Sequence, residues 1–565
     1  MTASEAEQPG PGRTATAPRI AGAGHIAMHA RVPRPAVQGL LALGAYLAVF
    51  IIGFAFPLIR HPGLPWIGQG EVDPNFYIWS WRWWPYAVSH GLNPLYSGQI
   101  GAPVGNDLAW TTTTPAVALL LAPVTAAFGP ITSFNLTLLL AAPVSAWAAF
   151  VAARRLTGRF WASLLAGAVY GFSPYEIGHT GAGQANLIVI MLLPLMLYLA
   201  LLWRDGKLGR LAFAGLMALA LTLEFYISDE AFAEVVALWA VGLLIGFAVA
   251  RPADRRVVAR LAGLVGAAVA VAIVLASPYL VYALRHQPAN FTKSAYVLNL
   301  KSLVDPPSVI LLLVIALALA VFAWSSRLTR LLVILLVLIV ALALGPDLVA
   351  GTSRVGSVPW ARLWSLPFAR NAEPARLMLF AYLVLAIMLA LWLAMPVKNR
   401  LLLALRWILG LAAVAGILAY IPAASRGSVL PANVAAAAAR PTDALPSFVS
   451  DGLYRDYLRP GEIVVVVSER GNAGMLFQAD ANFYFRIAGG FINVTLSNRT
   501  ALPTPVQNLM DPTRAAQRQF RAYVRQAGVG AILVEQNWAS PWMQVFSRMG
   551  LHGTPVGGVI VYRTA

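Results

Sequence analysis

Long apolar runs separated by short polar loops constrain this chain more than any other feature. Eleven such runs follow one another between residues 36 and 421. A helix that crosses the hydrocarbon core of a bilayer needs about 20 mainly apolar residues, and shorter runs can borrow flanking aromatic and arginine side chains. The pattern predicts a polytopic α-helical membrane protein. The runs are 36–56, 131–151, 160–172, 187–203, 211–226, 231–250, 261–284, 309–324, 331–344, 377–395 and 401–421.

The composition supports a membrane protein and excludes several functions. Only 11% of the 565 residues are charged and 59% are hydrophobic, whereas a soluble domain carries about 25% charged residues. The formal net charge of +18 does not indicate nucleic-acid binding, because the arginines stand in short clusters between the apolar runs. The chain has no cysteine, which excludes disulfides, thiolate catalysis and cysteine-based metal sites.

The basic clusters predict an orientation. Residues 1–34 are polar, rich in Pro and Gly, and basic, so we expect a disordered cytoplasmic tail. The basic loops 154–159, 204–207, 251–260, 327–330 and 398–400 join this tail on one side, provided that the short run 115–128 lies in the interface and does not span. The loop 57–130 and everything after residue 421 then lie outside the cytoplasm. We therefore expect a transmembrane domain over 35–421.

The C-terminal segment, 422–565, lacks long apolar runs and predicts a soluble extracytoplasmic α/β domain. Residues 463–467, 530–534 and 559–562 have the composition of buried strands, and 513–526 has helical spacing. No phosphate loop, zinc spacing or nucleophile elbow occurs in it.

The first outer loop carries two carboxylates two residues apart, Glu71 and Asp73, directly before Pro74. An aromatic stretch follows, with Trp79, Trp81, Trp83 and Trp84, which we expect to form a helix anchored at the membrane interface. A turn or helix cap would explain Asp73 equally simply.

Further polar residues stand at the outer ends of the predicted spans. They are His179 in a Gly-rich stretch, Glu224 near the end of one span, Asp229 and Glu230 before the next, and Arg370 and Arg376 before the tenth. Each has a plainer explanation. The carboxylates could cap a helix, Glu224 could reach the interface, His179 could be solvated, and the arginines could bind lipid headgroups.

These motifs resemble those of the GT-C membrane glycosyltransferases, which carry an acidic pair in the first outer loop. Glu71-Val72-Asp73 matches the E-x-D form, and 158–230 is similar to bacterial relatives. Residues 366–376 are similar to an Arg-x-Pro-x-Arg-like element, although Asn371, Ala372 and Glu373 intervene between Arg370 and Pro374. The resemblance implies a GT-C-like fold and sugar transfer from a polyprenyl-phosphate-linked donor to a cell-wall glycan, glycolipid or protein outside the bacterial cytoplasmic membrane.

The resemblance also implies roles for individual residues. Asp73 would be the general base, and Glu71 would orient it or join it in holding Mg²⁺ or Mn²⁺. Arg370 and Arg376 would bind the donor phosphate, and His179, Glu224, Asp229 and Glu230 would contact substrate.

Two other functions remain open from the sequence. A lipid or polysaccharide transporter or flippase should show internal repeats and charges at mid-membrane, and neither is evident in the sequence. A non-catalytic envelope assembly factor would not need the Asp73 carboxylate.

Overall fold

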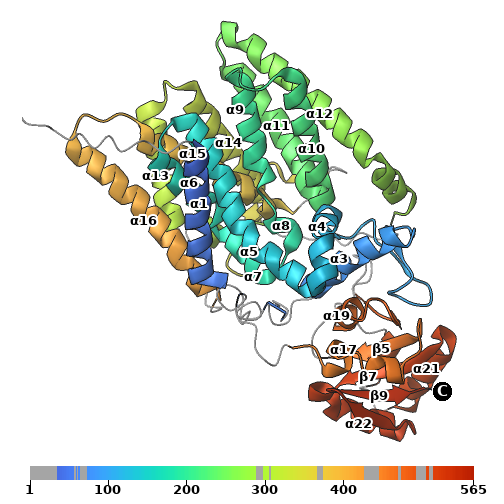
Figure 1. The fold of residues 1–565 in the computed structure, drawn as a ribbon. Coiled ribbons are helices and arrows are strands. Elements are labelled where there is room, and N and C mark those ends of the chain that lie inside the picture. Colours follow the sequence, from blue (N-terminus) through green and yellow to red (C-terminus); the bar gives the residue numbers. More distant parts are fainter. Residues whose placement is uncertain are drawn as a thin grey trace, which may run out of the picture.

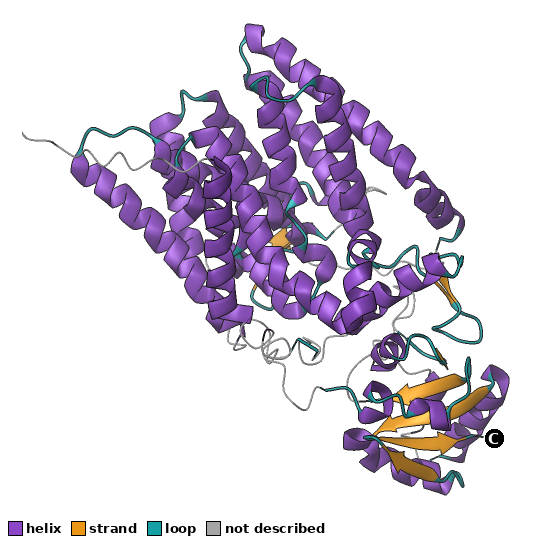
Figure 2. Cartoon of the chain, viewed as in Figure 1, coloured by secondary structure: helices purple, strands orange, loops and turns teal. Residues whose placement is uncertain are grey.

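The computed structural model describes residues 35–55, 59, 62–63, 73–287, 297–303, 307–365, 373–425, 444–468, 473–490, 504–507, 509 and 513–564. They form a large helical bundle and a smaller C-terminal domain built on a sheet (Figures 1 and 2). The predicted tail 1–34, Glu71 and Arg370 lie outside the described residues.

The bundle runs from residue 35 to residue 425. Its helices are α1 (Pro35–Phe50, continued by a π-turn over Ile51–Ala55), α3 (Asp73–Ser89), α4 (Pro115–Leu120), α5 (Ala122–Thr157), α6 (Phe160–Gly171), α7 (Pro174–Ala182), α8 (Ala185–Ile188), α9 (Leu192–Arg204), α10 (Arg210–Ile227), α11 (Asp229–Val249), α12 (Pro252–Arg285), α13 (Pro307–Ala323), α14 (Arg327–Ala343), α15 (Met378–Ala394) and α16 (Arg400–Ser425). Short hairpins, β1–β2 (Tyr96–Ser97, Asn106–Asp107) and β3–β4 (Asp347–Ala350, Ser353–Ser357), and 3₁₀ turns (Leu300–Leu303, Ala361–Ser365, Pro374–Leu377) lie in the loops.

Each of the eleven predicted spans falls on a helix of the bundle. Among the described residues, eight helical segments are long and apolar enough to cross a membrane: Pro35–Ala55, Ala122–Thr157, Ala185–Arg204, Arg210–Ile227, Asp229–Val249, Pro252–Arg285, Pro374–Ala394 and Arg400–Ala419. Phe160–Gly171 and Pro307–Ala323 are shorter apolar helices, and the run 331–344 lies in α14. The multi-span architecture is confirmed, while the count of eleven stays a prediction.

The ambiguous run 115–128 forms α4 and the first turns of α5. Gly129, with φ 83° and ψ 164°, breaks the helical path inside α5, and α4 has only 6 residues. At 1.5 Å per residue, α4 is about 9 Å long, too short to cross a hydrocarbon core of about 30 Å. This geometry agrees with an interfacial run.

Small residues bring α5 and α6 into close contact. A Cβ on Gly171 would lie 2.5 Å from the backbone oxygen of Ala142, and one on Gly167 would lie 2.5 Å from that of Ala146. These glycines are four residues apart, the spacing that lets two membrane helices approach closely. Both helices are thereby fixed under the loops that carry the candidate site.

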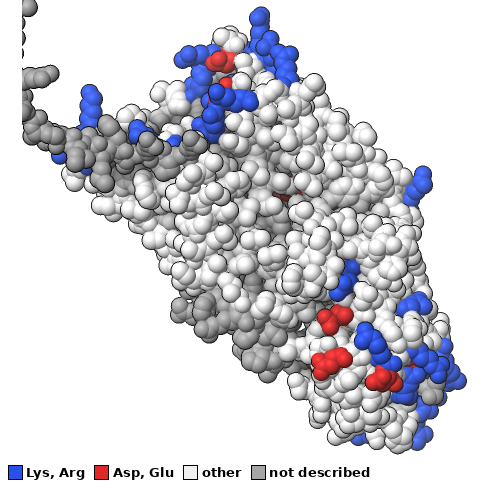
Figure 3. Space-filling view, viewed as in Figure 1, with Lys and Arg blue, Asp and Glu red and all other residues white. Residues whose placement is uncertain are grey.

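Charges separate along the bundle. Figure 3 shows Lys and Arg at the end of the bundle away from the C-terminal domain, and its middle is almost free of charge on this face. Such a band is what the apolar interior of a bilayer requires of a protein surface. The basic end lies opposite the C-terminal domain, as the positive-inside pattern predicts.

The C-terminal domain is a mixed sheet with helices on both faces. Its helices are α17 (Ser447–Ser450), α18 (Tyr454–Tyr457), α19 (Ala473–Asp480), α20 (Thr504–Gln507), α21 (Arg514–Ala527) and α22 (Ala539–Arg548), with a 3₁₀ turn over Gln536–Trp538. The strands are β5 (Ile463–Val467), β6 (Arg486–Ile487), β7 (Val529–Glu535), β8 (Gly553–Val556) and β9 (Val559–Arg563), in the order β6-β5-β7-β9-β8. β5 is parallel to β6 and β7, and β9 is antiparallel to β7 and β8. All three predicted strands and the predicted helix are present.

The two faces of this sheet pack against different parts of the chain. Val464 and Leu533 belong to one buried cluster with α19 and the bundle. The alternating residues Val465 and Ile532 belong to a second cluster with α21 and α22. Because successive side chains in a strand point to opposite faces, the α19 face of the sheet is turned toward the bundle and the α21 face away from it.

Helix α3 joins the bundle to the C-terminal domain. Trp79, Trp81 and Trp83 are at most 2% exposed. The rings of Trp79 and Trp83 contact Phe483 of the C-terminal domain at 5.8 and 5.6 Å, and Trp81 lies against Phe134 of α5. The prediction that these tryptophans anchor α3 in the lipid interface is therefore wrong. Their rings hold two parts of the protein together.

Candidate active site

Asp73 is the first residue of α3, a helix that lies at the end of the bundle facing the C-terminal domain (Figure 1). Pro74 follows it, as is common in the first turn of a helix, and a carboxylate is favoured at this positive end of the helix dipole. The Asp73 side chain is half-buried, and its Oδ2 accepts a hydrogen bond from Gln184 Nε2 at 3.1 Å. Burial raises the pKa of Asp73, which the Gln184 hydrogen bond and the charge of Arg376 partly offset.

Gln184 is positioned by the end of α7. Gly183 ends this helix in the left-handed region with φ 68°, and a Cβ there would lie 2.7 Å from Pro74 Cγ. A side chain at 183 would therefore push α3 away from Gln184. The close approach places the Gln184 amide against the Asp73 carboxylate.

His179 stands behind Gln184 and completes a short polar chain. Its Nδ1 lies 2.5 Å from Gln184 Oε1, and its ring meets that of Tyr175 edge-on at 4.5 Å. Burial lowers the pKa of His179 to about 4, so the imidazole is neutral at pH 7. Since Gln184 donates to Asp73 through Nε2, its Oε1 accepts the proton of His179 Nδ1. His179 thus orients the group that binds Asp73.

Tyr77 lies one helical turn beyond Asp73, on the same face of α3. Its hydroxyl donates to Asn186 Oδ1 at 2.5 Å and lies 3.2 Å from Thr112 Oγ1. Burial raises the pKa of Tyr77, so the phenol keeps its proton. These contacts tie α3 to the segment before α9.

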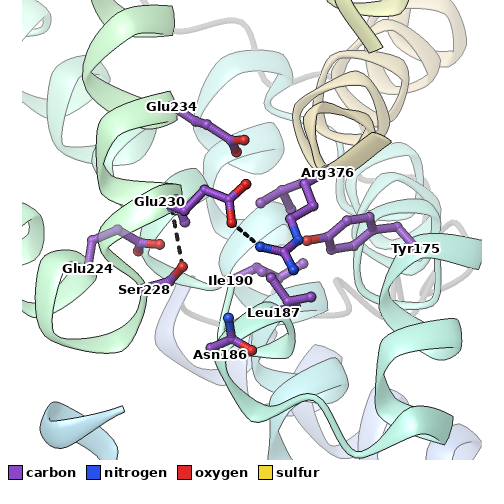
Figure 4. Close-up of a pocket in the computed structure, with 11 residues that line it drawn as sticks. Tyr175, Asn186, Leu187, Ile190, Glu224, Ser228, Glu230, Glu234 and Arg376 are labelled. Atoms are coloured by element: carbon purple, nitrogen blue, oxygen red, sulfur yellow. Dashed lines mark hydrogen bonds and ion pairs between the residues drawn. The ribbon is translucent and has the colours of Figure 1, made fainter. Parts of the chain in front are cut away.

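Asn186 also lines a small cavity, shown in Figure 4, and Arg376 in its lining is close enough for its charge to act on Asp73. Glu224, Glu230, Glu234 and Arg376 extend toward this space from α10, α11 and the turn before α15. The lining residues are Tyr175, Asn186, Leu187, Ile190, Glu224, Ser228, Glu230, Ala231, Glu234, Arg376 and Leu379.

Arg376 supplies the positive charge of the cavity lining. Its Nη1 pairs with Glu230 Oε2, and its Nη2 lies 2.9 Å from Glu373 Oε2. Glu230 Oε1 accepts the backbone N–H of Glu373 at 2.7 Å, which closes a three-residue unit. Glu230 and Glu373, when ionised, carry two negative charges against the single positive charge of Arg376. A phosphate would therefore have to displace one of these carboxylates in order to bind Arg376.

Several buried carboxylate oxygens have no hydrogen-bond partner among the described residues. They are Oε2 of Glu224, Oε1 of Glu234 and both oxygens of Glu176, in side chains that are 4%, 9% and 0% exposed. Leaving a buried polar atom unpaired costs about 1–3 kcal/mol, so such atoms are expected to meet a ligand or to hold a proton. Burial raises the pKa of Glu176 well above its ordinary value.

The structure brings most of the predicted site residues together. Asp73 and His179 meet through Gln184, and Glu224, Glu230 and Arg376 line the adjacent cavity. Asp229 does not line it. Its side chain is exposed, and its Oδ1 accepts the N–H of Glu230 at 3.0 Å. Ser228, not a carboxylate, caps α11 by accepting the N–H of Ala231.

Sequence reasoning missed four polar residues of this site: Glu176, Gln184, Asn186 and Glu234. A signal existed for Glu234, because a carboxylate one turn inside an apolar span is rarely placed there without a function. The same argument applies to Glu176, which follows a stretch of aromatic and apolar residues. Gln184 and Asn186 carry no such signal, since amides are ordinary in loops.

The described residues do not complete a cation site. They contain no group of three or more His, Cys, Asp or Glu side chains that could hold a metal ion, and Asp73 Oδ2 is already bound by Gln184. Glu71, the second predicted ligand, lies outside the described residues.

Comparisons with known proteins agree on the fold. A family model described as a domain of unknown function, DUF6311, matches residues 41–313. No curated protein matches the sequence. The arabinofuranosyltransferase AftD from mycobacteria is similar with a TM-score of 0.61 and 16% identity, over 94% of this chain and 42% of AftD. This chain thus spans less than half of the length of AftD.

Two further solved structures are similar over 94% of this chain. One is the oligosaccharyltransferase AglB from Archaeoglobus fulgidus in complex with an inhibitory peptide and a dolichol-phosphate, with a TM-score of 0.53, 12% identity and 74% of AglB covered. The other is ArnT from Cupriavidus metallidurans bound to undecaprenyl phosphate, with a TM-score of 0.51, 11% identity and 99% of ArnT covered. All three are GT-C glycosyltransferases, and this chain has a GT-C-like fold.

Proposed function

We propose that this protein is a glycosyltransferase that moves a sugar from a polyprenyl-phosphate-linked donor to an acceptor outside the bacterial cytoplasmic membrane. The acceptor would be a cell-wall glycan, a glycolipid or a protein. The observation that carries the proposal is the position of Asp73: a half-buried carboxylate, fixed by Gln184, at the start of the helix that joins a GT-C-like bundle to the C-terminal domain.

The fold supports the class of donor. ArnT was solved with undecaprenyl phosphate and AglB with a dolichol-phosphate. A lipid-linked donor needs a site at the membrane surface that also opens toward a soluble acceptor. Here α3, which begins at Asp73, packs against both α5 of the bundle and α19 of the C-terminal domain, which suits both requirements.

Asp73 would act as the general base. The acceptor oxygen or nitrogen bonds to the anomeric carbon while the bond from that carbon to the phosphate oxygen breaks. The acceptor proton passes to the Asp73 carboxylate, and the polyprenyl phosphate leaves with the bonding electron pair. Attack from the face opposite the phosphate inverts the anomeric centre. Burial raises the pKa of Asp73, which makes its carboxylate a stronger base than an exposed aspartate.

The acidic cavity has a volume of about 10 Å³, room for one water-sized group, so it would receive a hydroxyl group at one edge of the sugar. The unpaired oxygens of Glu224 and Glu234 can accept hydrogen bonds from sugar hydroxyl groups, and Tyr175 adds an aromatic face. Arg376, and Arg370 from the segment outside the described residues, would bind the donor phosphate. For Arg376 this means exchanging Glu230 or Glu373 for phosphate when the donor enters.

The test uses purified protein in lipid nanodiscs with a panel of undecaprenyl- and decaprenyl-phosphate pentoses and hexoses and an envelope extract as acceptor. We expect release of polyprenyl phosphate, detected by mass spectrometry, from one donor in the panel.

Asp73→Asn should lower the rate about 10²–10⁴-fold while expression and melting temperature stay normal. Asp456→Asn, which changes an exposed carboxyl of the C-terminal domain, is the matched control. Wild-type turnover by Asp73→Asn would reject the base.

A further inference from the structure

Helix α21 of the C-terminal domain carries a row of four arginines on one face. They are Arg514, Arg518, Arg521 and Arg525, all exposed. At 100° per residue their side chains fall within an arc of about 60°, and the row is about 16 Å long. The helix contains no acidic residue. Figure 3 shows the resulting basic edge of the C-terminal domain, where Figure 1 labels α21.

The arginine row is turned away from the membrane domain. Phe520 and Val524, on the inner face of α21, pack in the cluster that covers the sheet face opposite the bundle. The other face of the sheet shares its core with α19 and the bundle. The outer side of a helix on the far face points away from the bundle. This orientation favours a partner in the surrounding medium over the membrane that holds the bundle.

The charge of the row is not neutralised within the described part of the chain. No ion pair there joins any of the four arginines to a carboxylate. Arg521 Nη2 donates to the backbone oxygen of Met549 at 2.9 Å, and Arg525 Nε to that of Arg521 at 3.4 Å. A backbone carbonyl orients a guanidinium and leaves its positive charge uncompensated.

A pocket opens at one end of the row. It has a volume of about 270 Å³ and is lined by Phe520, Arg521, Val524, Arg525, Met549, Leu551 and Thr564. The lining combines four apolar side chains with two arginines and a threonine. The volume is close to the lower end of the range for small-molecule sites, about 300–1,000 Å³. One sugar unit with an acidic substituent matches this lining, because its ring can contact the apolar side chains and its anion the arginines.

We propose that α21 binds an anionic glycan polymer, whose sugar units carry carboxylate or phosphate groups. One unit occupies the pocket, and the next units run along the arginine row. A single phosphate or carboxylate cannot span 16 Å, so the ligand must present several anions in series. This inference goes beyond the proposed transfer reaction and does not depend on it, because binding needs no sugar donor.

The experiment measures binding of dye-labelled decagalacturonate to the full chain in nanodiscs of neutral lipid, by fluorescence anisotropy. We expect saturable binding that neutral maltodecaose does not compete. Arg514→Gln with Arg518→Gln should weaken binding about tenfold at low salt. The slope of log affinity against log salt should fall by about 1–2, since each neutralised anion contributes about 0.7–0.9 for polyanions such as nucleic acids.

Two variants control the measurement. Arg455→Gln with Arg459→Gln makes the same change in net charge at exposed positions of the same domain and should leave binding within twofold. Arg514→Lys with Arg518→Lys keeps the charge and should stay within about threefold, which separates loss of charge from misfolding.

Three results would overturn the inference. Equal binding of maltodecaose would mean that charge is not recognised. Unchanged decagalacturonate binding by the double glutamine variant would move the site elsewhere. Flotation of the wild type, but not of this variant, with phosphatidylglycerol vesicles would assign the row to an anionic membrane. If binding holds and no donor is turned over, only the proposed transferase function fails.

Discussion

Gln478 is the residue through which the C-terminal domain holds the helix of Asp73. It lies on α19 with no exposed surface. Its Oε1 accepts the indole N–H of Trp79 at 2.7 Å, and its Nε2 donates to the backbone oxygens of Gln99 and Phe485, each at 2.8 Å. One amide thus joins three groups of this junction.

We expect Gln478→Ala to open this junction without unfolding either part. The Trp79 N–H loses its acceptor in a fully buried position, which costs about 1–3 kcal/mol. Gln99 O keeps a second donor, Ile487 N at 2.9 Å, so its loss is smaller. The cavity left by the shortened side chain adds about 1–2 kcal/mol. A total of about 3 kcal/mol corresponds to an increase of about 100-fold in the open population.

Hydrogen–deuterium exchange with mass spectrometry measures this population. Protection of peptides over 73–89 and 96–107 should fall by up to about 100-fold, while peptides of α6 and α15, inside the bundle, stay protected. Gln544→Ala, at an exposed position of α22, is the control and should leave all peptides unchanged. Equal loss of protection throughout the bundle, or a change below twofold in α3, would refute the argument.

Three further predictions concern the site. Glu176→Gln should raise the melting temperature relative to wild type increasingly from pH 5 to 8. The pKa of Glu176 is higher in the folded than in the unfolded state, so the free energy of unfolding of the wild type falls by about 1.4 kcal/mol per pH unit between these two pKa values. A variant that is less stable than the wild type at pH 8 would contradict this. Gln184→Leu removes the hydrogen bond that lowers the pKa of Asp73, so the acidic limb of the pH–rate profile should move to higher pH. If the rate falls but the acidic limb of the profile stays at the same pH, Gln184 has a packing role only. If Glu71 and Asp73 hold Mg²⁺ or Mn²⁺, EDTA abolishes turnover and the cation restores it, whereas undiminished turnover in EDTA excludes an essential cation.

The sequence predicted the elements of this protein because their signals are local. An apolar run long enough for a bilayer is helical in any context, since lipid offers the backbone no other hydrogen-bond partner. The strands 463–467 and 559–562 are likewise visible as short β-branched runs. Asp73 and Arg376 could be singled out because they stand in motifs that resemble those of GT-C glycosyltransferases, and Glu224 because an ionisable group within a span is costly without a purpose.

Tertiary structure alone decided how these residues meet. Gln184 is distant from Asp73 in sequence, and the two touch because Gly183 lets α7 approach Pro74. The tryptophans of α3 gave an interfacial pattern in sequence, yet Trp79 and Trp83 are buried against the C-terminal domain and Trp81 against α5. A local pattern records that a side chain needs an apolar surface. Only the folded chain determines whether lipid or protein supplies that surface.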